Sequence, residues 1–586
     1  IFNQDISGWD VSNVTNMGYM FSGTEAFNQN IGNWDVSSVT TMRYMFEDAA
    51  KFNQNIDNWV VSSVTTMEGM FSGATIFNQD IGAWDVSSVT TMRYMFYEAD
   101  AFDQDIGGWD VSNVTNMNRM FYEADAFNQN ISGWDVSSVT TMEGMFYEVD
   151  AFNQNISGWD VSSVTTMNRM FYEADAFDQD ISGWDVSNVT NMGYMFSGTE
   201  VFNQNISNWD VSSVTTMGYM FEDATGFNQN IGGWDVSSVT RMDGMFWNAR
   251  VFNQNISGWD VSSVTTMARM FEATAKFNQN IGNWDVSNVI GMSIMFGGAT
   301  GFNQNIGGWS VSNVNYMYGM FSGATIFNQN ISGWDVSNVT NMGYMFSGTE
   351  AFNQNIGNWD VSSVTTMEGM FSGATIFNQD ISGWDVSNVI DMSDMFHGVT
   401  LSTPNYDVLL LGWSQLSLQI GVIFDGGNSK YSNAATDARQ AIISNFSWII
   451  NDGGLATPRA FTLSSHAGTP DTDGSFTLMW TNSDGANNYS IYRYSGYITE
   501  INGSLTLLAS EITDLNITLN GYSDGIYYFI VVAHNEYGNT LSNCIKIEVE
   551  SLKSLPTIPG YHLYLLISMI FIISVVLIKN RSNYFK

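Results

Sequence analysis

The sequence is poor in cysteine, lysine, arginine and histidine, and each shortage excludes something. A single cysteine, Cys544, rules out an internal disulfide, so no disulfide framework holds the fold together. Only 18 basic side chains face 58 acidic ones, and the net charge of -40 excludes a general nucleic-acid binder, because phosphate contacts need clustered Lys and Arg. The same charge excludes an anionic membrane surface as the main partner. The four histidines lie far apart in sequence and show no metal-ligand spacing.

Catalytic motifs are missing as well. No nucleophile is paired with a base, and there is neither a histidine cluster nor a phosphate-binding loop, so we expect no enzyme and no resident cofactor. The acidic balance suits cationic partners, Ca²⁺ or high salt without choosing among them. The chain begins at Ile1, inside a repeat, and we expect it to be a fragment that lacks its natural N-terminus.

What the sequence does contain is one unit repeated at a strict period of 25 residues. Counted from the first Phe of each copy, sixteen copies run without insertion from Phe2 to Phe377. In the copy FNQNISGWDVSSVTTMEGMF, which begins at Phe127, the two-residue spacing of Trp134 and Val136 predicts a short strand. The spacing from Val139 to Phe146 predicts one or two helical turns. Such a unit cannot bury its apolar face alone, so stacked copies must share a continuous core.

These letters carry a resemblance to a known family. The unit WDVSSVTxMxxMF with FNQxI resembles the surface-protein repeat of the BspA-like family, the DUF285 type, which is a relative of leucine-rich repeats. The spacing Ile131-x-x-Trp134-x-Val136 is similar to the strand of that class, although Trp and Met stand where Leu is usual. The resemblance covers residues 2 to about 400. It implies a cell-surface protein, often an adhesive one, and no catalytic residues.

The repeated Trp, Met, Asn and Gln residues are open to a ligand-binding interpretation, but packing explains them better. A Trp column can stack sugars, and Met columns can bind a soft metal such as Cu(I). We predict that both are core, because every copy keeps them at inward-phased positions. The amides of FNQN are expected to bond to one another between repeats.

An Asp follows the Trp in 14 of the sixteen copies, with Val60 and Ser310 as the exceptions. Stacked carboxylates repel one another, so we expect each to accept backbone N–H bonds in a turn, with bound Ca²⁺ as the alternative. The copies written FDQDI are richest in Asp and give the Ca²⁺ candidates, which are Asp103, Asp105, Asp178 and Asp180.

Two further kinds of site are predicted on the outward face. Asn113 and Asn130 match the N-glycosylation acceptor pattern. Positions that differ among copies are expected to face outward and to tune a partner surface, against the alternative of a surface that drifts without selection. The candidate partner-binding residues are Tyr122, Glu143, Tyr147, Tyr172, Trp247 and Arg250.

The C-terminal third changes character after the array. Residues 401–460 are predicted to cap the solenoid, with a helix-like stretch at 434–443 and a strand-like one at 448–450. Residues 461–550 show alternating strands and resemble a fibronectin type III domain, a seven-stranded β-sandwich. Residues 551–562 read as a linker. Residues 563–578 read as a transmembrane helix or a removable sorting signal, and 579–586 as a basic cytoplasmic tail.

Together these features predict a fold class and a function. The fold is a leucine-rich-repeat-like solenoid over residues 1–400, with a short strand and a short helix per repeat. An all-β sandwich and one transmembrane helix follow it. We expect a single-pass protein of the cell surface with its repeats outside and its C-terminus in the cytoplasm. Its solenoid face would bind surface proteins or glycans, not nucleic acid, by multivalent contact. The alternative is a structural stalk of the cell envelope without a specific ligand.

Overall fold

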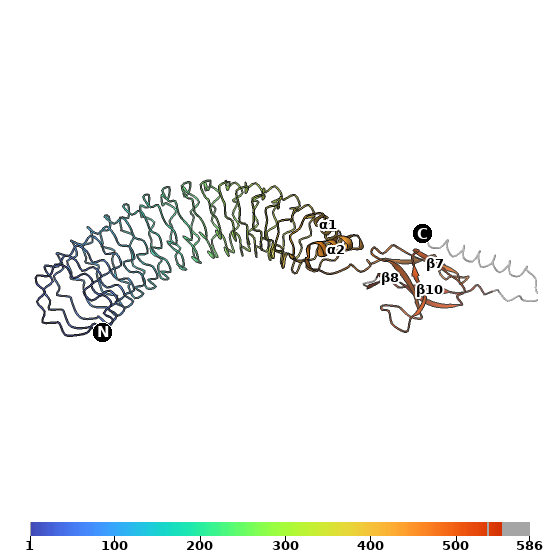
Figure 1. Ribbon diagram of the computed structural model, residues 1–586, viewed down its shortest axis with the longest axis horizontal. Helices are drawn as coiled ribbons and strands as arrows, with labels where there is room; N and C mark the ends of the chain where they lie inside the picture. Colours follow the sequence, from blue (N-terminus) through green and yellow to red (C-terminus); the bar gives the residue numbers. More distant parts are fainter. Residues whose placement is uncertain (1, 536–537, 554–586) are drawn as a thin grey trace, which may run out of the picture. The chain divides into compact units, whose positions relative to one another are not determined.

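The computed structural model describes residues 2–535 and 538–553. The chain forms two compact units, Ile1–Leu455 and Ala456–Lys586, each with its own core (Figure 1). The first unit contains the sixteen repeats and the cap, and the second is rich in β-strands. The first unit ends at Leu455, a few residues before residue 460, where the cap was predicted to end.

The repeats consist of turns, and the predicted strand and helix are both wrong. Residues 2–400 contain turns and single bridge residues, and neither a helix nor a strand. The backbone N–H of Trp134 closes a turn by donating to the carbonyl of Ile131 at 3.1 Å. The only parallel bridge of each repeat lies further along, where Asn116, Thr141 and Thr166 of successive repeats pair. Alternation of buried residues and a spacing of three or four both arise here from consecutive tight turns, which explains the error.

Backbone N–H groups of residues 142–148 point alternately to the next repeat and back into their own. Those of Met142, Gly144, Phe146 and Glu148 donate to carbonyls of the following repeat at 2.7–3.2 Å. The N–H of Met145, between them, donates within the repeat to the carbonyl of Met142 at 3.2 Å. Each repeat therefore satisfies its polar backbone partly through its neighbour, as a buried chain without regular secondary structure must.

Two residues in every repeat have left-handed backbone. In the repeat that begins at Phe127 they are Gly144, with φ of 57°, and Glu148, with φ of 51°. Both donate their N–H groups to the next repeat. For a residue other than glycine this conformation costs roughly 1–2 kcal/mol. Because it recurs in all sixteen repeats at both positions, the stacking of the repeats must supply that energy.

The core is a set of columns of identical side chains. The Trp, Met and Phe residues at the repeated core positions of the internal repeats are at most 4% exposed, which confirms that these columns are core. Each indole donates to the Ile carbonyl of the preceding repeat, as Trp134 does to Ile106 at 3.0 Å. Phe121 stacks on Phe127 of the following repeat, with ring centroids 3.9 Å apart.

Unequal spacing between columns curves the stack. Successive buried Trp rings, such as those of Trp134 and Trp159, lie 6.5 Å apart. The outward rings of Tyr122 and Tyr147 lie 4.1 Å apart. The rings are thus spaced more closely in the tyrosine column than in the Trp column, and the repeats form an arc in Figure 1.

The cap continues the last repeat, as predicted. It contains α1 (Thr403–Trp413), β1 (Ile423–Asp425), the 3-10 helix η1 (Asn433–Ala435), α2 (Thr436–Phe446) and β2 (Ile449–Asn451). Phe424 of β1 forms a parallel bridge with Met392 of the last repeat, and β2 pairs with β1. The apolar core of the solenoid runs on into Trp413 and Phe424, so the end of the stack is covered.

The second unit has two open sheets around one core. Its strands are β3 (Leu463–Ser465), β4 (Phe476–Trp480), β5 (Asn488–Tyr494), β6 (Thr506–Ile512), β7 (Asn516–Leu519), β8 (Gly525–Asn535), β9 (Gly538–Leu541) and β10 (Ile545–Val549). One sheet has the order β3-β4-β7, and the other has β10-β8-β5-β6 with β9 also on β8. Trp480 of the first sheet and Ile491 and Phe529 of the second lie in the same core. The alternating strands predicted within residues 461–550 are present.

Within the described residues, 2–535 and 538–553, no helix has the length and apolarity needed to cross a bilayer. The predicted membrane helix at 563–578 and the basic tail at 579–586 lie outside those residues.

We expect that replacing Trp159 with Phe lowers the stability of the solenoid. The substitution removes the indole N–H that donates to the buried carbonyl of Ile131 at 3.2 Å, and an unsatisfied buried carbonyl costs about 1–3 kcal/mol. Trp9 supplies the matched control, because its side chain is 55% exposed. Urea unfolding of residues 1–553 should show a lower midpoint for Trp159→Phe and no change for Trp9→Phe. Equal midpoints for the two variants would contradict the account.

Candidate functional site

Three of the six predicted partner-binding residues form one exposed column. Tyr97, Tyr122, Tyr147 and Tyr172 occupy the same position in four consecutive repeats. Their rings stack with centroid distances of 4.6, 4.1 and 4.5 Å. We call these four rings the tyrosine ladder. All four side chains are partly exposed, so the ladder is a surface feature and not an extension of the core.

Two columns of carboxylates flank the tyrosine ladder. One is formed by the residue after each Tyr and the other by the third residue after it, and together they contain Glu98, Asp100, Glu123, Asp125, Glu148, Asp150, Glu173 and Asp175. Burial and then the neighbouring carboxylates raise the pKa of Glu123 and of Asp125. Burial also raises the pKa of Tyr147. Stacking thus brings like charges together, which leaves a negative strip. The guanidinium of Arg119 lies at its edge, with 5.9 Å from Cζ to the ring centroid of Tyr122.

A polar groove continues this strip beyond the tyrosine ladder. It has a volume of about 440 Å³ and is lined by Glu173, Asp175, Gly198, Glu200, Asp223, Thr225, Asn248 and Arg250. Gly198 lines the groove at the position where the glutamate column is interrupted. It connects the acidic strip with Arg250, whose Nε donates to Asn248 at 2.8 Å.

The remaining two predicted residues have partners within the solenoid. Glu143 forms an ion pair with Arg119 of the preceding repeat at 3.0 Å. Trp247 lies under the guanidinium of Arg269, with 5.0 Å from Cζ to the ring centroid. Glu143 lies beside the acidic strip and neutralises Arg119, whereas Trp247 lies three repeats beyond Tyr172.

Sequence reasoning missed the two carboxylate columns. A signal was present, because the letters YEADA occur in three of these four repeats and YEVDA in the fourth. The predicted residues were single variable positions, whereas the signal lies in the agreement between consecutive repeats. Identical residues form a column only when they occur in consecutive repeats, because each repeat contacts only its neighbours.

The four Ca²⁺ candidates act as hydrogen-bond acceptors in the positions that Asn occupies elsewhere. Asp103 accepts the N–H of Asn128 at 3.0 Å and Asp178 that of Asn203 at 3.1 Å, as Asn128 does for Asn153. Asp105 and Asp180 each accept the N–H two residues ahead. Within the described part of the chain, these four are not gathered into any cluster of three metal-binding side chains. Ca²⁺ binding by them stays a prediction.

The Asp that follows each Trp has the partner expected of it. Asp110 accepts both the N–H of Ser112 at 3.1 Å and its hydroxyl at 2.7 Å. The hydroxyl and then the N–H of Ser112 lower the pKa of Asp110. The FNQN amides also bond between repeats, as predicted, since Gln154 donates to Asn128 at 2.9 Å.

Both predicted glycosylation residues are exposed. The side-chain N–H of Asn113 donates to the carbonyl of Ser87 at 2.8 Å. Asn130 uses its side-chain oxygen to accept the N–H of Ser132 at 3.0 Å. Their modification stays a prediction.

Stacked turns, a capped end and an outward face that varies by repeat define a repeat solenoid. Six overlapping segments match the family described as "Mycoplasma protein of unknown function, DUF285", namely residues 1–107, 53–159, 95–199, 175–273, 252–347 and 302–408. These segments cover more than half of the chain, which belongs to that family. No curated protein matches the sequence.

We expect the solenoid to gain stability as the pH falls from about 7.5 to about 5. Burial raises the pKa of Glu222 from 4.5 to about 6, and burial with neighbouring acids raises that of Glu148 and Asp175. The folded state therefore binds more protons than the unfolded state in this window, so stability rises as pH falls. Below about pH 4 the sign reverses, because acids of lowered pKa such as Asp160 are then protonated.

The melting temperature of residues 1–553, measured as a function of pH, tests both the rise in stability towards pH 5 and the fall below about pH 4. Glu222→Gln is the control and should show a smaller rise between pH 7.5 and 5 than the unchanged chain. A melting temperature that falls steadily with pH over this range would contradict the expectation.

Proposed function

We propose that this protein is a cell-surface recognition protein that binds a basic protein partner through the tyrosine ladder and its carboxylate columns. The observation that carries the proposal is the identity of the outward residues in four consecutive repeats, from Tyr97 to Asp175. Elsewhere the same positions hold smaller sets, such as Ser72, Gly73 and Thr75. A strip of repeated, equally spaced groups favours multivalent contact with a partner that also repeats its charges.

The stacking of the rings favours a protein over a glycan as the partner. Sugars stack on exposed aromatic faces, but within the ladder these faces are covered by neighbouring rings at 4.1–4.6 Å. At the two ends, Tyr94 and Tyr194 lie 5.7 and 6.3 Å from the terminal rings. The ladder thus presents ring edges beside rows of carboxylates, a surface that complements Lys and Arg side chains. The net charge of -40 favours the same class of partner and disfavours nucleic acid.

The other parts of the chain would present this surface. We propose a BspA-like arrangement in which the C-terminal unit is a fibronectin type III-like spacer and residues 563–578 anchor the protein in the membrane, with the repeats outside. The order β3-β4-β7 in one sheet and β10-β8-β5-β6 in the other supports the first part. A stalk without a specific ligand is the second candidate, supported by the twelve repeats that lack the ladder.

We expect a peptide of about 15 residues rich in Lys and Arg to bind residues 1–553, with an affinity that falls as salt is added. The test variant replaces Glu123 and Glu148 with Gly and Asp125 and Asp150 with Thr, the residues found at these positions in other repeats. It keeps the fold, since the solenoid already accepts these residues elsewhere. Binding measured by fluorescence anisotropy should weaken at least about tenfold, because four charges leave the strip.

The matched control removes four charges at another place. It replaces Asp103, Asp105, Asp178 and Asp180 with Asn, the residue that most other repeats have there. We expect this control to bind nearly as well as the unchanged chain. Equal weakening in both variants would show that only net charge matters, and the recognition proposal would fail. Stronger binding to a glycan array than to the peptide would favour a sugar partner instead.

A further inference from the structure

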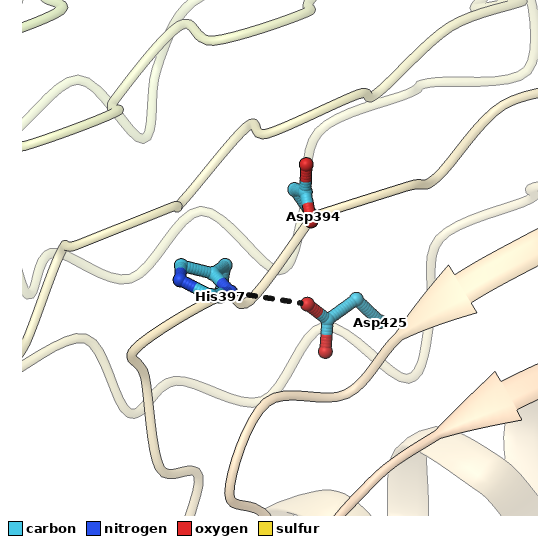
Figure 2. A group of neighbouring side chains, drawn as sticks. All are labelled: Asp394, His397 and Asp425. Carbon is cyan, nitrogen blue, oxygen red and sulfur yellow. Dashed lines mark ion pairs between the residues drawn. The ribbon is translucent and has the colours of Figure 1, made fainter.

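The joint between the last repeat and the cap holds a group of side chains that the recognition surface does not use. Asp394 and His397 belong to the last repeat, and Asp425 is the final residue of β1 in the cap (Figure 2). One ligand atom from each of the three lies within 4.8 Å of the others. Among the described residues, it is the only group of three His, Cys, Asp or Glu side chains whose ligand atoms lie this close together.

Backbone hydrogen bonds hold the three residues in register. The N–H of His397 donates to the carbonyl of Asp394 at 3.0 Å, so both side chains emerge from one tight turn. The N–H of Phe396, inside that turn, donates to the carbonyl of Asp425 at 3.1 Å. The N–H of Asp425 donates back to Met392 at 3.3 Å. The residues that carry the side chains are therefore fixed against one another although 28 positions separate His397 from Asp425.

The side chains offer three metal-ligand atoms close to one another. One oxygen of Asp425, Oδ1, accepts the N–H of Gly427 at 2.8 Å. Its other oxygen, Oδ2, lies 3.7 Å from Nδ1 of His397. Among the described residues, no Lys or Arg nitrogen forms an ion pair with Asp394 or Asp425. Two carboxylates this close repel one another unless a cation lies between them.

The combination is also peculiar to the last repeat. The preceding repeat has Gly369 and Ser372 where the last one has Asp394 and His397. None of the other fifteen repeats has Asp at the first position or His at the second. The donors therefore appear only where a repeat meets the cap, so the set is not a by-product of the repeated unit.

We propose that Asp394, His397 and Asp425 bind one divalent transition-metal ion, with Zn²⁺ as the best-suited candidate, and that this ion fastens the cap to the last repeat. Imidazole nitrogen and carboxylate oxygen are both ligands of Zn²⁺, whereas Ca²⁺ takes oxygen ligands alone. Ligand atoms of a tetrahedral Zn²⁺ lie about 3.4 Å apart, close to the His397–Asp425 distance. His397 and Asp394 are exposed and can turn the remaining way without moving the core. Three protein ligands leave the fourth position to water.

An ion at this place would act on the stability of the end of the solenoid. Each repeat contacts only its neighbours, so terminal units open most readily. A metal that binds the closed joint and not the opened one stabilises the closed joint by an amount that rises with the logarithm of the metal concentration once the site is filled. The proposal is independent of the recognition surface, because the tyrosine ladder lies in repeats far from the cap.

Isothermal titration of the metal-free full chain with ZnCl₂ tests the proposal. We expect one equivalent to bind and the melting temperature to rise with Zn²⁺ concentration. X-ray absorption at the zinc edge should show only nitrogen and oxygen ligands at about 2.0–2.2 Å, including a single imidazole. A 100-fold excess of CaCl₂ should not displace the ion. No binding at millimolar Zn²⁺, or displacement by Ca²⁺, would overturn the proposal.

Two variants locate the ion without disturbing the fold. The pair Asp394→Gly with His397→Ser restores the residues of the preceding repeat, and Asp425→Asn keeps an acceptor for the N–H of Gly427. Each should weaken Zn²⁺ binding at least about tenfold, since even the loss of a supporting residue costs 10–100-fold. His466→Asn, in the second unit, should bind as the unchanged chain does. Undiminished binding in the first two variants would place the ion elsewhere and overturn the assignment.

Discussion

Hydrogen bonds from each repeat to the next are the constraint on which this structure depends. Residues 2–400 have no helix or strand to satisfy their backbone, so alternate N–H groups, such as those of Gly144 and Glu148, must find carbonyls on the following repeat. That requirement fixes two left-handed residues in every repeat and stacks the buried side chains into columns. It also makes a single repeat unstable alone, because half of its turn hydrogen bonds belong to a neighbour.

The same stacking creates the proposed recognition surface. A side chain on one repeat is an isolated feature, whereas the same side chain on four consecutive repeats becomes a row with a spacing set by the backbone. Tyr97 to Tyr172 show this, since their rings stack at 4.1–4.6 Å while the carboxylates beside them are forced together. Duplication of one repeat thus extends a charged strip without any new fold, and exchange of a few outward residues ends it, as Gly198 does.

The sequence was sufficient to predict the period, the core and the order of the parts. Sixteen copies of the same apolar positions leave no other place for Trp134 or Met142, and changes of pattern mark the start of the β-rich second unit. It was not sufficient to predict the turn conformation, because tight turns imitate the spacing of strands and helices. The left-handed residues were hidden for a related reason: Glu148 has no preference for that conformation, and stacking imposes it. The group at Asp394, His397 and Asp425 depends on a pairing between distant segments, Met392 with Phe424, that no local pattern records.

Amide hydrogen exchange along the repeats tests the central claim most directly. If inter-repeat bonds hold the solenoid, then the N–H groups of Met142, Gly144, Phe146 and Glu148 and their counterparts should exchange slowly, with a period of 25 residues. In a fragment of residues 1–553, protection should be highest in the central repeats and lower towards Ile1, where that fragment ends. Protection concentrated instead at Trp134–Val136, or absent from the positions that donate to the next repeat, would contradict the account.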